Sequence, residues 1–282
     1  MDISIIAAQL VKEKVILHYP NSVKVLNGGT TSTVYLLDEK YVVKLNEAEV
    51  IREESHFLSF YEGNTLLSKL LYKEPFHTYF VYSFLEGSTS CEQGYKRSTL
   101  RTLVKEVINK YKIVPEAGGW GWKENPVQSW NEFLTGNVKT AYENVKRYTS
   151  EEEYRKVLKL ANRDAGVNQP FLLHGDCGFH NFIFRQNKLH GVIDPLPVLG
   201  DPLYDLIYAF CSTPEELTKE TINYAMKQCV FHKQERDLYE EIVIGLYLRI
   251  DICVRHHPKD LEDYLIAWRY WMDEIEPALQ YK

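Results

Sequence analysis

The sequence predicts an α+β fold in which a small, β-rich N-terminal lobe precedes a larger helical C-terminal lobe. Short runs of β-branched and aromatic residues, which are typical of strands, are concentrated before residue 87. Long segments with apolar residues at helical spacing dominate after it. A polar stretch at 88–94 separates the two parts. Because 282 residues can bury a core in each part, we expect lobes at 1–86 and 87–282.

The first lobe should contain four strands and two helices. Strand-forming residues mark three closely spaced segments and one later segment: Val23–Leu26, Thr33–Leu37, Tyr41–Leu45 and 79–84. Between the third and fourth strands, the segment 47–61 has apolar residues along one face and is predicted to be a helix. An apolar patch at 3–8 is interrupted by polar residues soon afterwards, which indicates the start of an amphipathic helix.

The second lobe should be mainly helical. Apolar residues recur at helical spacing over 95–113, and a loop rich in Gly and Trp follows at 117–125. More helical sequence then reaches residue 164, and two long helical patterns cover 235–256 and 261–275. The sequence shows no internal repeat.

Composition excludes several classes of function. The formal net charge is −6, which argues against a general nucleic-acid binder because such proteins depend on clustered Lys and Arg. The five cysteines are scattered without a Cys-x-x-Cys pair, so neither a zinc site nor a disulfide framework is predicted. A reducing, cytoplasmic setting fits them best. No apolar run reaches the roughly 18 residues that a membrane span needs.

A hairpin in the second lobe places two metal-ligand side chains together. The strand patterns Phe182–Arg185 and 189–193 are joined by a turn of hairpin length at 186–188. The start of the first strand therefore lies beside the end of the second, where Asn181 and Asp194 flank the pair. An amide oxygen and a carboxylate without a nearby His or Cys suit a hard cation such as Mg²⁺.

Asp176 lies five residues before Asn181 and can face the same metal site. Asp176, Asn181 and Asp194 together suit phosphoryl transfer. In that reaction an Asp accepts the proton of the substrate hydroxyl while metal ligands hold Mg²⁺ on the phosphates. The motif H-G-D-x-x-x-x-N, followed by Ile-Asp, resembles the aminoglycoside phosphotransferase-like family, relatives of choline kinases and of eukaryotic protein kinases. The resemblance covers effectively the whole chain and implies a bilobal, protein-kinase-like fold. It implies Asp176 as the catalytic base, Asn181 and Asp194 as Mg²⁺ ligands, and ATP or GTP as co-substrate.

The residues around this motif are expected to support it. In the segment Gly-Asp-Pro-x-x-Asp, Asp201 is a natural helix N-cap with Pro202 at the first helical position. The family resemblance implies that Asp205 braces the catalytic loop. It also implies a supporting role for His174, the first residue of the motif. We interpret all three side chains as structural.

In the first lobe, Lys44 and Glu54 are predicted to pair. Lys44 lies in the middle of an apolar strand, where a charged residue alone would indicate only the solvated face. Glu54, however, lies on the apolar face of the following helix, and a carboxylate on a buried face needs a partner. Glu53 is expected on the exposed face. The pair matches the Lys–Glu pair that positions phosphates in kinases.

Two backbone segments are candidates for nucleotide contacts. The loop between the first two strands contains Gly28, Gly29 and Thr30, small residues that permit close approach to phosphate. An ordinary hairpin turn explains the same residues equally well, and only the position relative to Lys44 favours a phosphate loop. By the resemblance, the backbone that contacts adenine would come from three residues at the end of the fourth strand, Ser83, Phe84 and Leu85. The aromatic residues Trp120 and Trp122 would either line a substrate pocket or cover the core.

The sequence departs from eukaryotic protein kinases. Gly175 stands where those kinases carry an Arg, and ten residues between Asp194 and Asp205 are too few for an activation segment. We therefore expect a small-molecule O-kinase whose acceptor is an antibiotic or a metabolic alcohol. An aminoglycoside acceptor would need several carboxylates in the helical lobe. The alternative is a non-catalytic nucleotide-binding regulator on the same fold. Loss of Asp176, Asn181, Asp194 or Lys44 would indicate a regulator, and all four residues are present, which favours the kinase.

Overall fold

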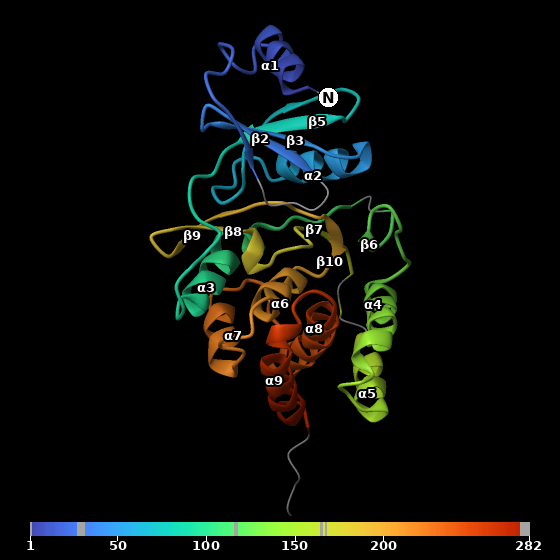
Figure 1. The fold of residues 1–282 in the computed structure, drawn as a ribbon. Helices are drawn as coiled ribbons and strands as arrows, with labels where there is room; N and C mark the ends of the chain where they lie inside the picture. The colour runs from blue at the N-terminus through green and yellow to red at the C-terminus, as the bar shows by residue number, and fades with distance from the viewer. Residues whose placement is uncertain (1, 27–31, 116–117, 164–165, 167, 277–282) are drawn as a thin grey trace, which may run out of the picture. The chain divides into compact units, whose positions relative to one another are not determined.

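The computed structural model describes residues 2–26, 32–115, 118–163, 166 and 168–276 (Figure 1). The chain divides into two compact units, and each is described by itself. The first unit comprises Met1–Ser90 and Asn181–Leu196, and the second comprises Cys91–His180 and Pro197–Lys282. A hairpin from the middle of the chain therefore belongs to the N-terminal unit.

The first unit is built on one antiparallel sheet of five strands in the order β1-β2-β3-β5-β4. Its strands are β1 (Val23–Leu26), β2 (Thr33–Leu37), β3 (Tyr41–Leu45), β4 (Leu70–Lys73) and β5 (Tyr79–Ser83). The four predicted strands are present, and β5 ends one residue earlier than predicted. Strand β4 was not predicted, because its sequence Leu-Leu-Tyr-Lys contains no β-branched residue. Its register against β5 shifts between Leu70 and Tyr72.

Helices lie on both faces of this sheet. The helix α1 (Ile3–Lys12) packs Ile6 and Leu10 into a buried cluster with Val43 of β3. Because successive side chains of a strand point to opposite faces, Lys44 points away from this cluster. The helix α2 (Ala48–Phe60) contacts β4 and β5 and carries Glu54.

The hairpin of β8 (Phe182–Arg185) and β9 (Lys188–Val192) completes the first unit. Its two-residue turn, Gln186 and Asn187, has φ angles of 52° and 58°, as in a type I′ turn. The segment after β5 pairs with this hairpin, since Ser88 and Phe184 exchange two backbone hydrogen bonds of 2.9 and 2.7 Å. Gly87 makes this approach possible, because a Cβ there would lie 2.5 Å from the Phe184 carbonyl oxygen.

The second unit consists mainly of helices: α3 (Lys96–Glu106), α4 (Trp130–Val145), α5 (Glu151–Ala161), α6 (Leu203–Cys211), α7 (Lys219–Met226), α8 (Glu235–His256) and α9 (Leu261–Glu274). The long helix α8 contacts α4, α5, α6 and α9. A small antiparallel sheet has the order β6 (Gly121–Trp122), β10 (Val198–Gly200) and β7 (Phe171–Leu173).

The predicted helix at 95–113 is shorter in the structure. Val107, with φ −121° and ψ −64°, departs from helical geometry after α3, and a 3₁₀ turn (Ile108–Lys110) follows. Beyond it Ile113 forms an isolated bridge with Phe171, so pairing beside the small sheet replaces a further helical turn.

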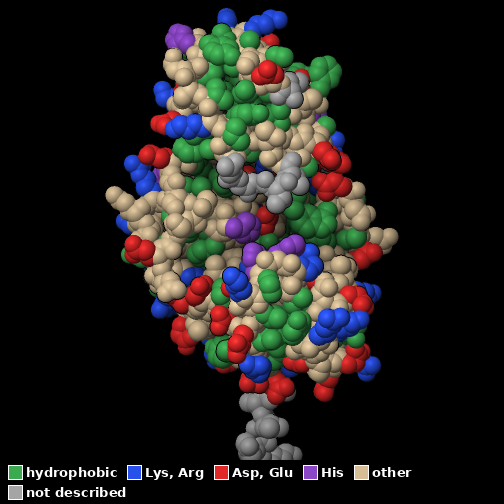
Figure 2. All heavy atoms as spheres, viewed as in Figure 1, with side chains coloured by type: hydrophobic (Ala, Val, Ile, Leu, Met, Phe, Trp, Pro, Cys, Tyr) green, Lys and Arg blue, Asp and Glu red, His purple; other side chains and the backbone are tan. Residues whose placement is uncertain are grey.

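On the face drawn in Figure 2, the described Lys and Arg side chains are interspersed with Asp and Glu. Among the residues that the structure describes, none of the helices combines the length and the apolar character needed to cross a membrane.

Candidate active site

Lys44 and Glu54 form a buried ion pair in the first unit. The Lys44 Nζ lies 2.7 and 2.8 Å from the two carboxylate oxygens of Glu54. Both side chains are almost completely buried, and Lys44 Nζ also lies 3.2 Å from Asp194 Oδ1. The pair predicted from the apolar face of the helix is therefore present, and it connects α2 and β3 to the end of the β8–β9 hairpin.

The expectation that Glu53 is exposed is wrong. Glu53 is buried, and its carboxylate lies 3.1 Å from Arg52 Nε. The buried face of α2 is broader than one apolar stripe, since it includes Glu53, Glu54 and Ser55 in succession. Neighbouring positions on a helix differ by about 100° around its axis, so α2 is covered on more than one side.

Burial dominates the electrostatics of this pair. Desolvation raises the pKa of the Glu54 carboxyl to about 7, although Lys44 opposes the shift. Desolvation acts to lower the pKa of Lys44, but Glu54 and Asp194 outweigh it and the pKa of Lys44 is raised. Burial raises the pKa of Tyr82, and the charges of Asp194 and Glu54 add to the rise. Phe80 of β5 is opposite Lys44, so Tyr82, two residues further along β5, is on the same face of the sheet as Lys44.

Asn181 and Asp194 lie at the open end of the hairpin. The Asn181 carbonyl accepts a 2.9 Å hydrogen bond from the amide of Ile193, so Asp194 is one residue beyond the position opposite Asn181. Asp194 has a φ of 55°, a left-handed conformation that Asp and Asn tolerate better than other side chains. Its side chain is 41% exposed, which leaves carboxylate oxygen accessible beside Lys44.

The chemistry of this donor set fits Mg²⁺. A carboxylate and an amide offer oxygen ligands, and Mg²⁺ is usually held by one or two protein groups together with waters and phosphate oxygens. Asn181 and Asp194 would hold the ion. Within the described residues, no group of three or more His, Cys, Asp or Glu side chains forms a further candidate metal site.

The structure limits which backbone atoms of residues 83–85 could contact a nucleotide. The amides of Ser83 and Phe84 already donate to the carbonyls of Lys69 and Lys40, at 2.9 and 2.8 Å. Adenine recognition by this segment would therefore use carbonyl oxygens or the Leu85 amide. The loop residues predicted to approach phosphate lie outside the described residues: Gly28, Gly29 and Thr30.

Asp176, in the second unit, has a donor near each carboxylate oxygen. The Tyr208 hydroxyl of α6 donates to Oδ1 at 2.6 Å, and His180 Nε2 lies 3.2 Å from Oδ2. Burial acts to raise the pKa of Asp176, but the hydrogen bonds from His180 and Tyr208 outweigh it, so the pKa is lowered. The carboxylate is therefore ionised at neutral pH, as a proton acceptor must be.

Asp205 fixes the backbone of the motif that contains Asp176. Its carboxylate accepts hydrogen bonds from the amides of His174 and Gly175, at 2.7 and 3.0 Å, and from the Tyr111 hydroxyl at 2.5 Å. Asp205 and His174 are both completely buried. Burial raises the pKa of Asp205 to about 6, and the hydrogen bonds from Tyr111, His174 and Gly175 oppose this rise.

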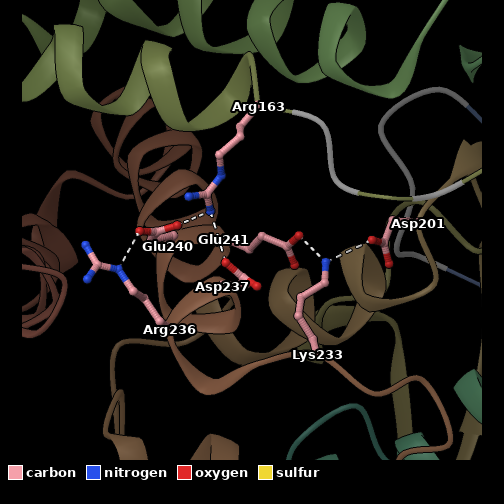
Figure 3. Close-up of polar contacts among 7 residues, drawn as sticks. All are labelled: Arg163, Asp201, Lys233, Arg236, Asp237, Glu240 and Glu241. Carbon is pink, nitrogen blue, oxygen red and sulfur yellow. Dashed lines mark hydrogen bonds and ion pairs between the residues drawn. The ribbon is translucent and has the colours of Figure 1, made fainter.

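Asp201 has two structural contacts, and Figure 3 shows the one with Lys233. One oxygen accepts a 2.8 Å hydrogen bond from the amide of Leu203 at the start of α6. The other lies 3.0 Å from Lys233 Nζ, which also pairs with Glu241 of α8. The helix begins at Leu203 with Pro202 as its N-cap, yet Asp201 supplies the capping hydrogen bond. Asp201 thus joins α6 to the beginning of α8.

Trp120 and Trp122 lie at the edge of an aromatic cluster in the second unit. The Trp120 ring is 6.4 Å from that of Trp130, and the Trp122 ring is 5.7 Å from that of Phe133. Both tryptophans are half-buried, so each covers the cluster on one side and leaves part of its ring accessible.

Sequence reasoning missed Tyr208, His180 and Tyr82. Tyr208 and His180 contact Asp176, and Tyr82 lies on the same face of the sheet as Lys44. A signal existed for His180, which is four residues after Asp176 in the same loop. Tyr208 had the weaker signal of lying three residues after Asp205 on the same predicted helix.

The fold is protein-kinase-like, with an N-terminal antiparallel sheet and a larger helical part. The model of the phosphotransferase enzyme family matches residues 22–228. The match covers well over half of the chain, and the chain belongs to this family. No curated protein sequence matches it.

Solved structures share the fold at low sequence identity. A streptomycin–ATP complex of the aminoglycoside phosphotransferase APH(2'')-IIa is 18% identical, covers 97% of this chain and 96% of its own, and has a TM-score of 0.60. A GDP complex of aminoglycoside 2'-phosphotransferase-IIIa is 16% identical, covers 97% of this chain and 99% of its own, and has a TM-score of 0.61. The macrolide 2'-phosphotransferase MphH from Brachybacterium faecium is 13% identical, covers 94% of this chain and 97% of its own, and has a TM-score of 0.59.

Proposed function

We propose that this protein transfers the terminal phosphate of ATP or GTP to a hydroxyl group of a small molecule in the cytoplasm. The observation that carries the proposal is the position of Lys44, a buried cation held by Glu54 and directed at Asp194. A buried charge needs a partner that offsets its lost hydration, and Glu54 and Asp194 supply it here. Lys44 thus leaves one fixed positive charge beside the proposed metal ligand, as phosphate binding requires.

The proposed nucleotide-binding half is residues 1–86 together with the β8–β9 hairpin. Lys44 would contact phosphate oxygens, and Asn181 and Asp194 would hold Mg²⁺, which neutralises charge on the phosphates. The segment 83–85 would contact the base through carbonyl oxygens or the Leu85 amide. Because one solved relative holds ATP and another holds GDP, both nucleotides are candidates.

Asp176 would accept the proton of the acceptor hydroxyl as its oxygen bonds to the terminal phosphorus and the bridging oxygen leaves with the nucleoside diphosphate. Its low pKa keeps it ionised for this role. Five residues separate Asp176 from Asn181, so the chain can span no more than about 18 Å between them.

The acceptor remains a choice between an antibiotic and a metabolic alcohol. Solved structures with this fold include an aminoglycoside phosphotransferase with streptomycin and a macrolide phosphotransferase. The accessible parts of Trp120 and Trp122 would suit the flat or apolar face of a ring-containing acceptor. A non-catalytic regulator is disfavoured, because Asp176 is held ionised and Lys44 is paired, as the reaction requires.

A nucleotide-consumption screen tests this proposal. ATP and GTP are each supplied with Mg²⁺ and a panel of hydroxyl compounds that includes aminoglycosides, macrolides, sugars and amino alcohols. Asp176→Asn should lower turnover by about a thousandfold or more while nucleotide affinity changes little, because the base is lost and the phosphate contacts are kept. Turnover close to wild type in Asp176→Asn would overturn the assignment of the base.

A further inference from the structure

The carboxylate of Asp176 has donors on both sides. Tyr208 donates to Oδ1 at 2.6 Å, and His180 Nε2 lies 3.2 Å from Oδ2. The terminal torsion of an Asp side chain is broad and roughly two-fold, so an Asp without such contacts samples a range of carboxylate planes. Two donors on different oxygens restrict that plane. Each oxygen has two acceptor positions, so a second proton donor can still bind.

The Tyr208 donor is held in place by its helix. Tyr208 lies on α6, the helix that also carries Asp205, whose carboxylate binds the amides of His174 and Gly175. One helix therefore positions the backbone before Asp176 and the carboxylate of Asp176 itself.

The loop after Asp176 is shaped to return His180 to this carboxylate. The amide of Gly178 donates to the Asp176 carbonyl at 2.9 Å, which tightens the chain. A Cβ on Gly178 would lie 2.6 Å from His180 Cε1 and 3.2 Å from Tyr208 Cε1. Only glycine fits between the two rings without displacing one of them.

We propose that Tyr208 and His180 are positioning residues that hold the Asp176 carboxylate in the orientation in which it accepts the acceptor proton. This inference rests on the proposed function of Asp176. Tyr208 is the stronger donor of the two, because its hydrogen bond is short, charge-assisted and made from a rigid helix. His180 is 54% exposed and supplies the second contact from the loop.

Correct orientation of a reacting group affects the chemical step and not substrate binding. Loss of the Tyr208 hydroxyl should therefore lower kcat and leave KM for nucleotide and acceptor unchanged. A hydrogen bond to a charged group is strong enough that we expect kcat to fall by about tenfold or more.

The experiment compares Tyr208→Phe with Tyr204→Phe, which removes a hydroxyl from the same helix one turn earlier. Turnover is measured with the best acceptor of the panel, or with water as acceptor where no compound raises the rate. Tyr208→Phe should lose about tenfold or more in kcat at unchanged KM, and Tyr204→Phe should retain the wild-type kcat. Both variants should unfold at a temperature close to that of the wild type.

A double-mutant cycle shows whether Tyr208 acts through Asp176. In the Asp176→Asn background, Tyr208→Phe should cause no further loss. A wild-type kcat in Tyr208→Phe, or an equal loss in both backgrounds, would overturn the positioning role while the assignment of Asp176 stands. Wild-type turnover in Asp176→Asn would instead overturn the proposed function and this inference with it.

His180 is tested by rescue. His180→Ala removes the second donor and should lower kcat, whereas His180→Gln retains a side-chain N–H at a similar distance and should recover most of the rate. Equal losses in both variants would exclude a hydrogen-bonding role for His180. Gly178→Ala provides a further test because it keeps both donors but displaces the His180 ring, and it should reproduce the His180→Ala loss.

Discussion

Asp205 illustrates how a completely buried charge is stabilised in this protein. Its carboxylate accepts two backbone amides and the hydroxyl of Tyr111. Burial alone would favour the neutral acid, and the three donors compensate for the lost hydration. The same residue therefore contributes to folding and determines the path of the backbone that carries Asp176.

Asp205→Ala should destabilise the protein and abolish turnover. The substitution leaves the amides of His174 and Gly175 and the Tyr111 hydroxyl without their acceptor in a dry environment. We expect the free energy of unfolding to fall by roughly 3 kcal/mol. Denaturant unfolding measures this loss. Tyr111→Phe, which removes one donor and leaves the carboxylate with two, should cost clearly less, and an equal cost would contradict this account.

Single-residue predictions from sequence succeeded where one element alone defines the environment. Glu54 could be assigned because the helix pattern places it among apolar residues. Tyr208 could not be assigned to Asp176, because 32 positions separate them and their contact depends on how α6 packs against the loop. Glu53 was assigned to the exposed side, since a one-sided pattern does not reveal that α2 is covered more broadly.

Local pattern also determined how well whole elements were predicted. Strands β1, β2 and β3 and helices α8 and α9 agree with their predictions within a residue, because each has a clear periodicity. Strand β4 and helix α7 are short and were missed. The helix predicted at 95–113 ends early because Ile113 pairs with Phe171, a contact that local periodicity does not encode.

Helix α2 allows a direct test of the Lys44–Glu54 pair. Glu54→Ala leaves Lys44 with Asp194 alone, and kcat/KM for nucleotide should fall by about tenfold or more. Glu53→Ala removes a carboxylate that lies 3.1 Å from the half-exposed Arg52 and has no ion pair with Lys44 among the contacts described above. It should reduce stability by about 1 kcal/mol and leave kcat/KM within about twofold of wild type.

The test measures kcat/KM for nucleotide in Glu54→Ala and Glu53→Ala at saturating acceptor. Thermal unfolding of each variant measures the change in stability. A larger loss of kcat/KM in Glu53→Ala than in Glu54→Ala would show that the wrong carboxylate has been assigned to Lys44.

Lys96 connects two elements of the second unit and should make its stability depend on pH. The side chain is 5% exposed and donates to the carbonyls of Thr213 and Glu215, at 2.9 and 2.5 Å, in the connection between α6 and α7. Desolvation lowers the pKa of Lys96 to about 7. A neutral amine has two N–H donors, which matches the two carbonyls.

The sign of the pH effect follows from proton binding. Between about pH 7 and 10.5 the unfolded chain binds a proton at Lys96 that the folded chain does not, so the stability contributed by Lys96 rises with pH. The difference in free energy of unfolding between wild type and Lys96→Met should shift in favour of wild type by about 1 kcal/mol per pH unit from pH 7 to 9. Denaturant unfolding at several pH values measures it, and a difference that stays constant with pH would contradict the lowered pKa.

At the scale of the whole molecule, sequence order and spatial grouping differ. The sequence predicts a single boundary near residue 87, but Asn181–Leu196 belongs to the N-terminal unit. The reason is tertiary pairing: Ser88 bonds to Phe184, and Val192 bridges to Leu67. As a result, Lys44, Asn181 and Asp194 belong to one compact unit, and Asp176 belongs to the other.

This grouping predicts that binding and chemistry can be separated by mutation. A ligand that binds the folded state stabilises it by RT ln(1 + [L]/Kd), which is about 2.7 kcal/mol at 100 times Kd. The unfolding temperature of wild type should therefore rise by roughly 5 °C with saturating nucleotide and Mg²⁺. Asp176→Asn should show the same rise, because Asp176 is outside the unit that carries the proposed nucleotide and metal contacts.

Asp194→Ala removes both the proposed metal ligand and one partner of Lys44, and it should lose the Mg²⁺-dependent part of this rise. Thermal unfolding with nucleotide alone, Mg²⁺ alone and both together separates the metal from the nucleotide contribution in each variant. An undiminished Mg²⁺-dependent rise in Asp194→Ala would exclude Asp194 as a metal ligand. Loss of the rise in Asp176→Asn would show instead that Asp176 takes part in binding the nucleotide, contrary to the division between the two units.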